Sequence, residues 1–274
     1  MEAQGQWQVA GNAAEVYEKE LVPAIFAPWA PLVLGLADPQ IGDRVLDVAC
    51  GTGIVARIAA DRVGPTGKVV GVDLNPGMLR VARAVSSTAS PSSARIEWRE
   101  ASAQELPFPN ESFDVACCQL GLQFFTDRTA ALREMHRVLV AEGRLALMVW
   151  RGIQESPGFA ELAEALEQNV GQGAAAIMRA PFGLSNADEL ATLVRNAGFQ
   201  AISIHQHVGT VRFPSIEALV LSYVAGSPLA GPVSQASNTV PAALVAAVKD
   251  TLGEYTRSGE LAFPIAAHLL GARA

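Results

Sequence analysis

The sequence predicts an α/β fold built on a doubly wound, mostly parallel sheet, and two neighbouring segments carry this prediction. Val45, Leu46 and Val48 form a short apolar run typical of a buried parallel strand, and Gly51 and Gly53 follow it as a turn. Residues 54–63 are predicted to form a helix, and residues 68–73 a second strand. This order of strand, glycine turn, helix and strand is the βαβ unit of folds that bind nucleosides.

Two acids and two glycines give this unit its chemistry. Asp47 is the one charge within the first strand, and Asp73 ends the second strand. A carboxylate at that end suits the two hydroxyls of a ribose. Gly51 and Gly53 allow the backbone to turn sharply and to approach a ligand closely. The free N–H groups of the following helix point back at the turn.

The remaining elements before residue 151 follow from periodicity and capping. Asn12 can cap a helix toward Ile25, and Pro23 either kinks this helix or lies in the first turn of a second one. Pro76 suits the first turn of a helix that ends near residue 85. The other elements are a helix at 29–36, strands at 95–99, 115–119 and 144–150, and an amphipathic helix at 127–139.

Beyond residue 151 the pattern predicts a helical segment followed by two more strands. Ser185 or Asn186 caps a helix that ends before Gly198. The other predicted elements are helices at 159–170, 215–225 and 241–256, a strand at 199–207 that can continue to 213, and a last strand at 261–270. A loop rich in Gly, Ser and Pro separates the last two helices.

The first strand and its turn distinguish two classes of cofactor. Gly51, Gly53 and Ala56 satisfy the G-x-G-x-x-G/A fingerprint of NAD-type proteins, but short glycine patterns are common. The additional acid, Asp47, indicates another class. Residues 45–53, V-L-D-V-A-C-G-T-G, resemble motif I of the class I S-adenosylmethionine-dependent methyltransferases. S-adenosylmethionine carries an ammonium and a sulfonium instead of a pyrophosphate, and these cations favour nearby acids and carbonyls.

A second segment resembles the same family independently. Residues 100–108, E-A-S-A-Q-E-L-P-F, and residues 112–116, S-F-D-V-A, are similar to the G-D-A-x-x-L-P-F and F-D-V-V segments of the ubiquinone/menaquinone-biosynthesis type, methyltransferase type 11. The Asp that accepts from the adenine amino group in the family falls on Ser102. A Ser hydroxyl accepts without charge, so this contact should be weaker or shifted. The Ala103 N–H can still reach an adenine ring nitrogen.

The resemblance implies S-adenosylmethionine as cofactor, no metal, and a set of binding residues. Gln119 lies at the carboxyl end of its strand, with Gln123 and Phe124 near the expected methyl-transfer point. Tyr17 resembles an aromatic residue that closes over the methionine end in related proteins, and a simple packing role suits it equally. The implied cofactor residues are Asp47, Ala49, Gly51, Gly53, Asp73, Leu74, Met78, Ala101, Ser102, Ala103, Gln104 and Gln119.

The resemblance also implies the whole architecture. It predicts a Rossmann-like sheet of seven strands in the order 3-2-1-4-5-7-6, with the last strand antiparallel and a helical cap. We expect a single class I methyltransferase domain over residues 1–274, with a core of about 40–150, 185–213 and 259–271. The cap would comprise residues 1–39, 151–184 and 214–258. Its apolar composition predicts a small, partly apolar organic acceptor in a largely enclosed pocket.

Composition excludes several other classes. The chain has 274 residues, half of them apolar, and a net charge of −7. It has no run rich in Lys and Arg, which argues against nucleic-acid binding, and no apolar run of the roughly 18 residues of a membrane span. Cys50, Cys117 and Cys118 have neither metal-ligand nor disulfide spacing. The polar residues 1–8 lack a signal sequence, and the prediction is a cytoplasmic protein.

The predicted reaction is a displacement at the sulfonium methyl, for which the protein mainly supplies orientation and exclusion of water. A general base is needed only for a hydroxyl or a protonated amine. His205 and His207 are candidates because they share one face of a strand, and His268 has less to recommend it. No catalytic residue is assigned. The motifs leave open O-, N- or C-methylation, the acceptor and the oligomeric state.

Two alternatives stay open at the level of the sequence. An NAD-type oxidoreductase would share the glycine turn and Asp73, but it would not require the F-D-V-A segment. The chain also lacks a Tyr-x-x-x-Lys or comparable hydride-transfer constellation. A protein that binds S-adenosylmethionine without transferring its methyl group would share every motif, since no essential catalytic residue marks methyl transfer.

Overall fold

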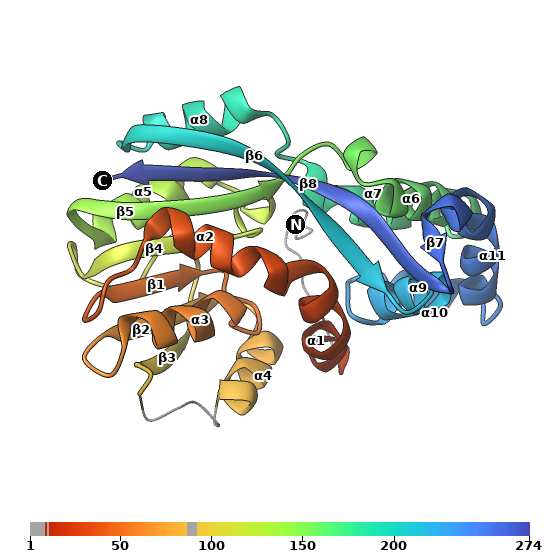
Figure 1. Cartoon of the computed structure of the whole chain (residues 1–274), viewed down its shortest axis with the longest axis horizontal. Coiled ribbons are helices and arrows are strands. Elements are labelled where there is room, and N and C mark those ends of the chain that lie inside the picture. The colour runs from red at the N-terminus through yellow and green to blue at the C-terminus, as the bar shows by residue number, and fades with distance from the viewer. Residues whose placement is uncertain (1–8, 10, 87–91) are drawn as a thin grey trace.

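A mixed eight-stranded sheet forms the centre of the computed structural model, which describes residue 9, residues 11–86 and residues 92–274 (Figure 1). The strand order is β3-β2-β1-β4-β5-β8-β6, with β7 paired to β8. The strands are β1 (Arg44–Val48), β2 (Lys68–Asp73), β3 (Arg95–Glu100), β4 (Phe113–Gln119), β5 (Leu139–Trp150), β6 (Gln200–Phe213), β7 (Thr256–Arg257) and β8 (Glu260–Arg273).

The pairing confirms the predicted topology. Strands β1 to β5 pair in parallel, whereas β8 runs antiparallel to both β5 and β6. The short strand β7, with two residues, was not predicted. The strand predicted as the seventh is therefore labelled β8. Neighbouring residues of a strand pack into different hydrophobic clusters: Val45 belongs to one cluster and Leu46 to the other. This follows from the alternation of side chains between the two faces of a sheet.

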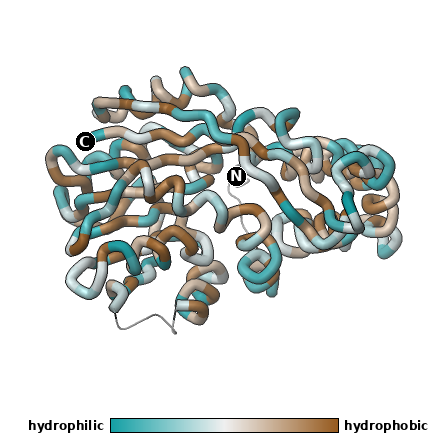
Figure 2. Tube along the Cα trace, viewed as in Figure 1, coloured by the Kyte–Doolittle hydropathy of each residue, from teal (hydrophilic) through white to brown (hydrophobic). Residues whose placement is uncertain are grey.

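Helices cover both faces of this sheet. The helices α2 (Ala30–Ala37) and α3 (Ile54–Val63) contact each other and the central strands, and their buried residues share one cluster. The helices α5 (Arg128–Val138) and α8 (Ala187–Asn196) contribute to the other cluster. The helix α4 (Pro76–Ser86) contacts β2 and β3. Figure 2 shows apolar residues concentrated along the central strands and polar residues in the connecting segments.

The N-terminal segment differs from both predicted forms, a helix kinked at Pro23 and a second helix that begins there. The helix α1 (Ala13–Val16) continues as a π-helix η1 (Tyr17–Phe26), and a 3-10 turn η2 (Ala27–Trp29) leads into α2. Pro23 lies inside η1 and has no N–H to donate, so regular α-helical hydrogen bonding cannot continue through it. Because α2 packs on the sheet, part of the segment 1–39 that we expected in the cap forms a layer of the core.

Five helices form the cap at the far ends of β6 and β8, away from the parallel strands (Figure 1). They are α6 (Pro157–Asn169), α7 (Gln172–Arg179), α9 (Ile216–Ala225), α10 (Ala230–Ala236) and α11 (Val240–Leu252). Buried residues of the two long strands, such as Phe213 and Phe263, belong to the same cluster as cap residues. The cap is therefore continuous with one half of the core.

The N-terminal stretch Ala13–Ala37 is the one unbroken helical run among the described residues that is long and apolar enough to cross a membrane. The pair α9 and α10 meets the same criterion only if its 105° bend is ignored. We expected no apolar run of that length from the sequence. Within the stretch, 44% of the most apolar window is buried, and Leu21, Ile25 and Leu34 are core residues. These apolar side chains therefore pack inside this fold.

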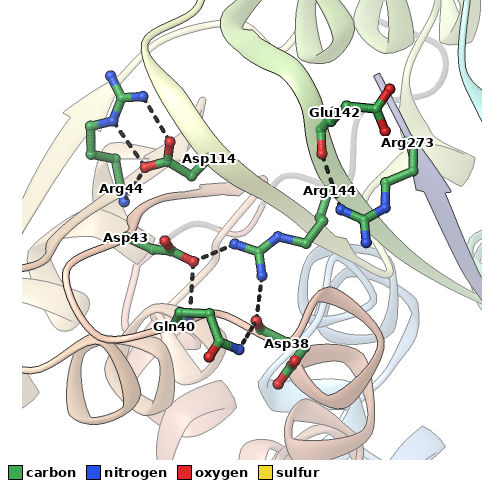
Figure 3. Close-up of polar contacts among 8 residues, drawn as sticks. All are labelled: Asp38, Gln40, Asp43, Arg44, Asp114, Glu142, Arg144 and Arg273. Atoms are coloured by element: carbon green, nitrogen blue, oxygen red, sulfur yellow. Dashed lines mark hydrogen bonds and ion pairs between the residues drawn. The ribbon is translucent and has the colours of Figure 1, made fainter.

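Ion pairs fix the amino edge of the sheet, opposite the carboxyl ends of its parallel strands (Figure 3). The Arg44 guanidinium donates to both carboxylate oxygens of Asp114, at 3.0 and 2.8 Å. The Arg144 guanidinium pairs with Asp43 and also donates to the Asp38 carbonyl. The hydrogen bonds from Arg44 hold the pKa of Asp114 below its ordinary value. These contacts join β1, β4 and β5 at the edge remote from the site described next.

Candidate functional site

A pocket lies at the carboxyl edge of the sheet, across the ends of β1, β2 and β4. This is the edge where ligands bind in open α/β sheets. Residues of η1 and of the cap close it from the other side. Eleven of the predicted cofactor residues line it: Asp47, Ala49, Gly51, Asp73, Leu74, Met78, Ala101, Ser102, Ala103, Gln104 and Gln119.

Asp73 is held in place by the glycine turn. Its Oδ2 accepts from the Gly51 N–H at 2.8 Å, and its Oδ1 accepts from the Asn75 N–H at 2.8 Å. Gly51 has a φ of 54°, in the left-handed region that glycine adopts without strain. Burial raises the pKa of Asp73, and the hydrogen bonds from these N–H groups oppose that shift. Each oxygen keeps accepting capacity toward the pocket, which suits the two ribose hydroxyls.

Asp47 lies beneath the start of α3 and is only 1% exposed. Its Oδ2 accepts from the Ala56 N–H at 3.0 Å. Burial raises the pKa of Asp47 to about 7, the hydrogen bond from Ala56 and the charge of Arg57 lower it, and the nearby Asp73 raises it. A carboxyl group therefore already accepts from one N–H group at this helix terminus. A pyrophosphate bound there would meet a like charge, whereas an ammonium would meet an opposite one.

Gly53 is the predicted cofactor residue that the structure places outside the pocket lining. Its φ is 86°, and its N–H donates to the Cys50 carbonyl at 2.8 Å. A Cβ at this position would lie 2.1 Å from the Trp98 ring. Its two structural requirements are therefore the left-handed turn and close packing against Trp98.

Four consecutive residues, 101–104, form one wall of the pocket next to Leu74 and Met78. The Ser102 Oγ accepts from the Gln104 N–H at 3.1 Å, so one of its lone pairs is already used. The Gln104 Oε1 accepts from the Asp127 N–H at 2.7 Å, which directs that side chain toward the start of α5. The Ser102 hydroxyl can still donate or accept one further bond toward a ligand.

The strand ends at the centre of the pocket have strained backbones. Ala49 after β1 and Leu120 after β4 have φ values of 56° and 60°, although neither is glycine. A Cβ on Gly121 would lie 2.6 Å from the Ala49 Cβ, so the two strand ends approach closely. Such outliers cost about 1–3 kcal/mol each and cluster at functional sites. The strain at Leu120 and the need for Gly121 could not be predicted from the sequence, because no turn pattern marks them.

Aromatic side chains line the pocket from η1, from the end of β5 and from the cap. The Tyr17 and Phe26 rings stack with centroids 4.9 Å apart, and burial raises the pKa of the Tyr17 hydroxyl above its ordinary range. Phe159, Phe182 and Tyr223, which the sequence placed in the cap, line the same space. Trp150 joins them from the end of β5, although the sequence analysis assigned it no role in the site. Tyr17 thus lies in the pocket wall and also packs.

Two glutamines near the end of β4 face this chamber. The Gln119 Nε2 donates to the Phe26 carbonyl at 3.0 Å, which ties η1 to the sheet. The Gln119 Oε1 is buried and has no hydrogen-bond partner among the described residues. Gln123 lies in the short 3-10 helix η3 (Leu122–Phe124) and also lines the pocket.

The three histidines that were candidate bases do not line this pocket. His205 and His207 are exposed on β6, and the His207 ring packs edge-on against Trp29 at 5.4 Å. The ring of His268 is buried, and its Nε2 contacts the Ser185 carbonyl at 2.8 Å. His136 packs edge-on against Phe199 at 5.0 Å, as a structural residue would.

The residues present fit S-adenosylmethionine. The ionisable acids of the lining, Asp47 and Asp73, match a cationic ligand with a ribose, and the free Gln119 Oε1 can accept from an ammonium. Among the described residues, no Lys, Arg or His lines the pocket. A dinucleotide pyrophosphate would therefore find no cationic side chain there.

Comparison with known proteins agrees with this geometry. A family described as "Methyltransferase domain" matches residues 46–147. A ubiquinone/menaquinone biosynthesis C-methyltransferase, UbiE of Xanthomonas campestris, is 41% identical over 124 residues, which are 45% of this chain and 49% of the relative. The chain thus spans about half the length of the curated relatives it matches.

Solved structures share the fold at low sequence identity. A phosphoethanolamine N-methyltransferase 2 of Haemonchus contortus, solved with S-adenosylhomocysteine, has a TM-score of 0.60 at 20% identity and covers 95% of this chain and 56% of its own. The [4+2]-cyclase SpnF has a TM-score of 0.54 at 22% identity, covering 90% of this chain and 81% of its own. Residues 46–147 thus match a methyltransferase domain, and over this part the chain resembles the class I S-adenosylmethionine-dependent methyltransferases, as its motifs predicted.

Proposed function

We propose that this protein transfers the methyl group of S-adenosylmethionine to a small, partly apolar organic acceptor. One observation carries the proposal: the same pocket joins an acid-bearing end at β1 and β2 to an aromatic chamber under the cap. A cationic cofactor suits the first end, and an apolar acceptor suits the second. The strand ends at Ala49 and Leu120 lie where the two ligands would meet.

In this proposal each part of the cofactor has its own residues. Asp73 holds the ribose hydroxyls, and the Gln119 Oε1 and Asp47 face the methionine ammonium. The adenine lies against residues 101–104, with Leu74 and Met78 on its other side. The positions of these groups around one pocket support the assignment.

The bound cofactor supplies the activated methyl group and its leaving group. The chain's own contribution is to orient the acceptor and to exclude water, and good orientation is worth roughly 7–11 kcal/mol. Burial raises the pKa of Tyr17 and Tyr223, so both hydroxyls stay protonated and act as hydrogen-bonding groups, not as bases. A nucleophile that needs no strong protein base, such as an electron-rich carbon or an acidic hydroxyl, therefore suits this chamber.

Among O-, N- and C-methylation, we favour C-methylation. The relatives that match the core are named as C-methyltransferases of ubiquinone and menaquinone biosynthesis. The aromatic lining of the chamber is compatible with a ring as acceptor. The cytoplasm is the proposed location, supported by three free, buried cysteines, Cys50, Cys117 and Cys118.

A second candidate function is binding of S-adenosylmethionine without methyl transfer. The [4+2]-cyclase SpnF has the same fold, so this fold also occurs with another activity. The pocket would look the same in both cases, since methyl transfer requires no marked catalytic residue. The NAD-type alternative is less favoured because Asp47 lies at the terminus of α3 where a pyrophosphate would bind.

The test begins with native mass spectrometry of the purified protein for retained S-adenosylmethionine or S-adenosylhomocysteine. The protein is then incubated with methyl-labelled cofactor and a panel of aromatic acceptors that differ in the atom offered. Label in a product carbon supports the proposal in full. Cofactor binding with no labelled product from any acceptor would favour the second candidate.

A further inference from the structure

The side chain of Gln123 is buried in the pocket wall without using its hydrogen-bonding groups. It is 7% exposed, and neither Nε2 nor Oε1 has a hydrogen-bond partner among the described residues. A buried, unpaired carboxamide destabilises a folded protein, because both groups lose their bonds to water. The backbone at this position is held, since the Gln123 carbonyl accepts from the Arg128 guanidinium at 3.3 Å. The backbone of Gln123 is therefore held in place, whereas its carboxamide is available to bind a ligand.

Gln119 provides a contrast within the same chamber. Its Nε2 is committed to the Phe26 carbonyl, so it presents only an acceptor to a ligand. Gln123 presents a donor and an acceptor side by side, in the plane of one carboxamide. A ligand that satisfies Gln123 must offer the complementary pair.

The surroundings of Gln123 determine what else that ligand must be. The chain has 10 Phe, 4 Trp and 3 Tyr residues, and eight of these line this one pocket. Among the described residues, no cationic side chain lines it, and its two acids lie at the cofactor end. An anionic acceptor would lose its hydration there without gaining a protein cation. A flat, uncharged ring system would meet aromatic surface.

We propose that Gln123 is the specificity-determining residue for an uncharged aromatic acceptor that carries a hydrogen-bond donor next to an acceptor. A carboxamide, or a hydroxyl beside a ring carbonyl, has this arrangement. The inference rests on the proposed function, because it places the methyl acceptor in the chamber. A site built around a buried polar group discriminates strongly against ligands that leave that group unpaired.

Three naphthalene probes of similar size separate the requirements. 2-Naphthamide offers a donor and an acceptor, 2-acetylnaphthalene offers only an acceptor, and 2-naphthoate is charged and offers only acceptors. Their dissociation constants are measured on protein saturated with S-adenosylhomocysteine. The variants are Gln123→Met, which keeps size but removes both polar groups, and Gln206→Met, a control at an exposed position on β6.

The parent and Gln206→Met should bind 2-naphthamide about tenfold more tightly than either other probe, the scale of one or two net hydrogen bonds. Gln123→Met should bind the amide and the ketone alike. The melting temperature of Gln123→Met without ligands should equal or exceed that of the parent, because an unpaired buried carboxamide has been removed. A merely structural glutamine would instead lower it.

Two results would overturn the inference. One is equal binding of all three probes by the parent. The other is a loss of S-adenosylhomocysteine affinity in Gln123→Met that matches its loss of 2-naphthamide affinity, which would place Gln123 in the cofactor site. In both results the parent still binds S-adenosylhomocysteine, so the proposed function is tested separately. Failure of the parent to bind S-adenosylhomocysteine would contradict the proposed function itself.

Discussion

Asp73 is the residue whose proposed role is most directly testable. Its carboxylate accepts from the Gly51 and Asn75 N–H groups and faces the pocket. Asp73→Ala leaves the ribose hydroxyls without a charged acceptor, so S-adenosylhomocysteine should bind about 1.5–3 kcal/mol more weakly. Calorimetry on a variant shown by circular dichroism to be folded checks this. Asp250→Ala, at an exposed acid of α11, should bind like the parent. An unchanged dissociation constant for Asp73→Ala would count against the ribose role.

Asp47 makes cofactor affinity depend on pH. Its pKa in the folded protein, about 7, lies above the ordinary value of 3.8, so the protonated carboxyl is favoured below neutral pH. A cationic cofactor prefers the ionised form, and binding near pH 6 must therefore release a proton. The affinity for S-adenosylmethionine should rise about tenfold from pH 6 to pH 8. Asp47→Asn should bind more weakly at pH 8 and vary little with pH. Equal slopes for the two proteins would exclude Asp47 as the titrating group.

The same shift has a consequence for the stability of the ligand-free protein. As pH rises, the unfolded chain ionises Asp47 first, near its ordinary pKa, and the folded protein does so only near 7. The contribution of this group to the free energy of unfolding therefore falls between about pH 4 and pH 7 and stays low above that range. Asp47→Asn should accordingly melt no lower than the parent at pH 8, while its cofactor binding is impaired.

At the residue scale, the sequence predicted the pocket lining better at the ends of β1 and β2 than under the cap. Asp47, Asp73 and Ser102 lie in segments whose spacing defines a motif, and all three line the pocket. Gly53 is the exception, because it does not line the pocket. Both a left-handed turn and a close ligand contact favour glycine, so the sequence does not distinguish the two roles. Trp150 carries no local pattern, since only the packing of the cap against β5 brings it to the pocket.

Close packing joins one cap helix to the long strand β8. A Cβ on Gly158, in the first turn of α6, would lie 2.4 Å from the Phe263 ring. Gly158→Ala must therefore displace either the helix or the ring, and should lower the free energy of unfolding by about 1–3 kcal/mol. Gly173 in α7 has nothing within 4 Å of its Cβ position and no left-handed backbone. Gly173→Ala should instead be neutral or stabilise by up to about 1 kcal/mol.

Urea denaturation of the two glycine variants and the parent checks this pair. Because both changes add one methyl group near the start of a cap helix, their difference isolates the contact with Phe263. Equal stabilities of Gly158→Ala and Gly173→Ala would show that α6 is not held by this contact.

At the element scale, errors in the prediction have local causes. The helices α7 and α10 lie in segments rich in glycine, serine or proline, which favour breaks, yet their buried residues Met178 and Val233 belong to the core cluster. Tertiary burial overrides propensity there. The strand β5 begins at Leu139 rather than Arg144, with Glu142 at a φ of 61°, because β4 and β5 pair across a register shift.

In the whole molecule, the ion pairs that stabilise the fold and the residues that line the pocket lie at opposite ends of the parallel strands. Ion pairs such as Arg44–Asp114 hold the amino edge (Figure 3). The pocket with its strained backbone occupies the carboxyl edge. The strand order was predictable because the motifs of residues 45–53 and 100–116 imply a known topology, which the pairing confirms. The cap was predictable only as apolar helices, since the arrangement of its helices over the pocket depends on long-range packing.

The central claim is that this pocket is built for an S-adenosyl cofactor. The most direct measurement is a calorimetric titration of the purified chain with S-adenosylhomocysteine and, separately, with NAD at the same concentration. Because acids and a neutral carboxamide line the cofactor end, we expect a dissociation constant on the micromolar scale for S-adenosylhomocysteine and no saturable binding of NAD. Tight binding of NAD together with no binding of S-adenosylhomocysteine would contradict the account.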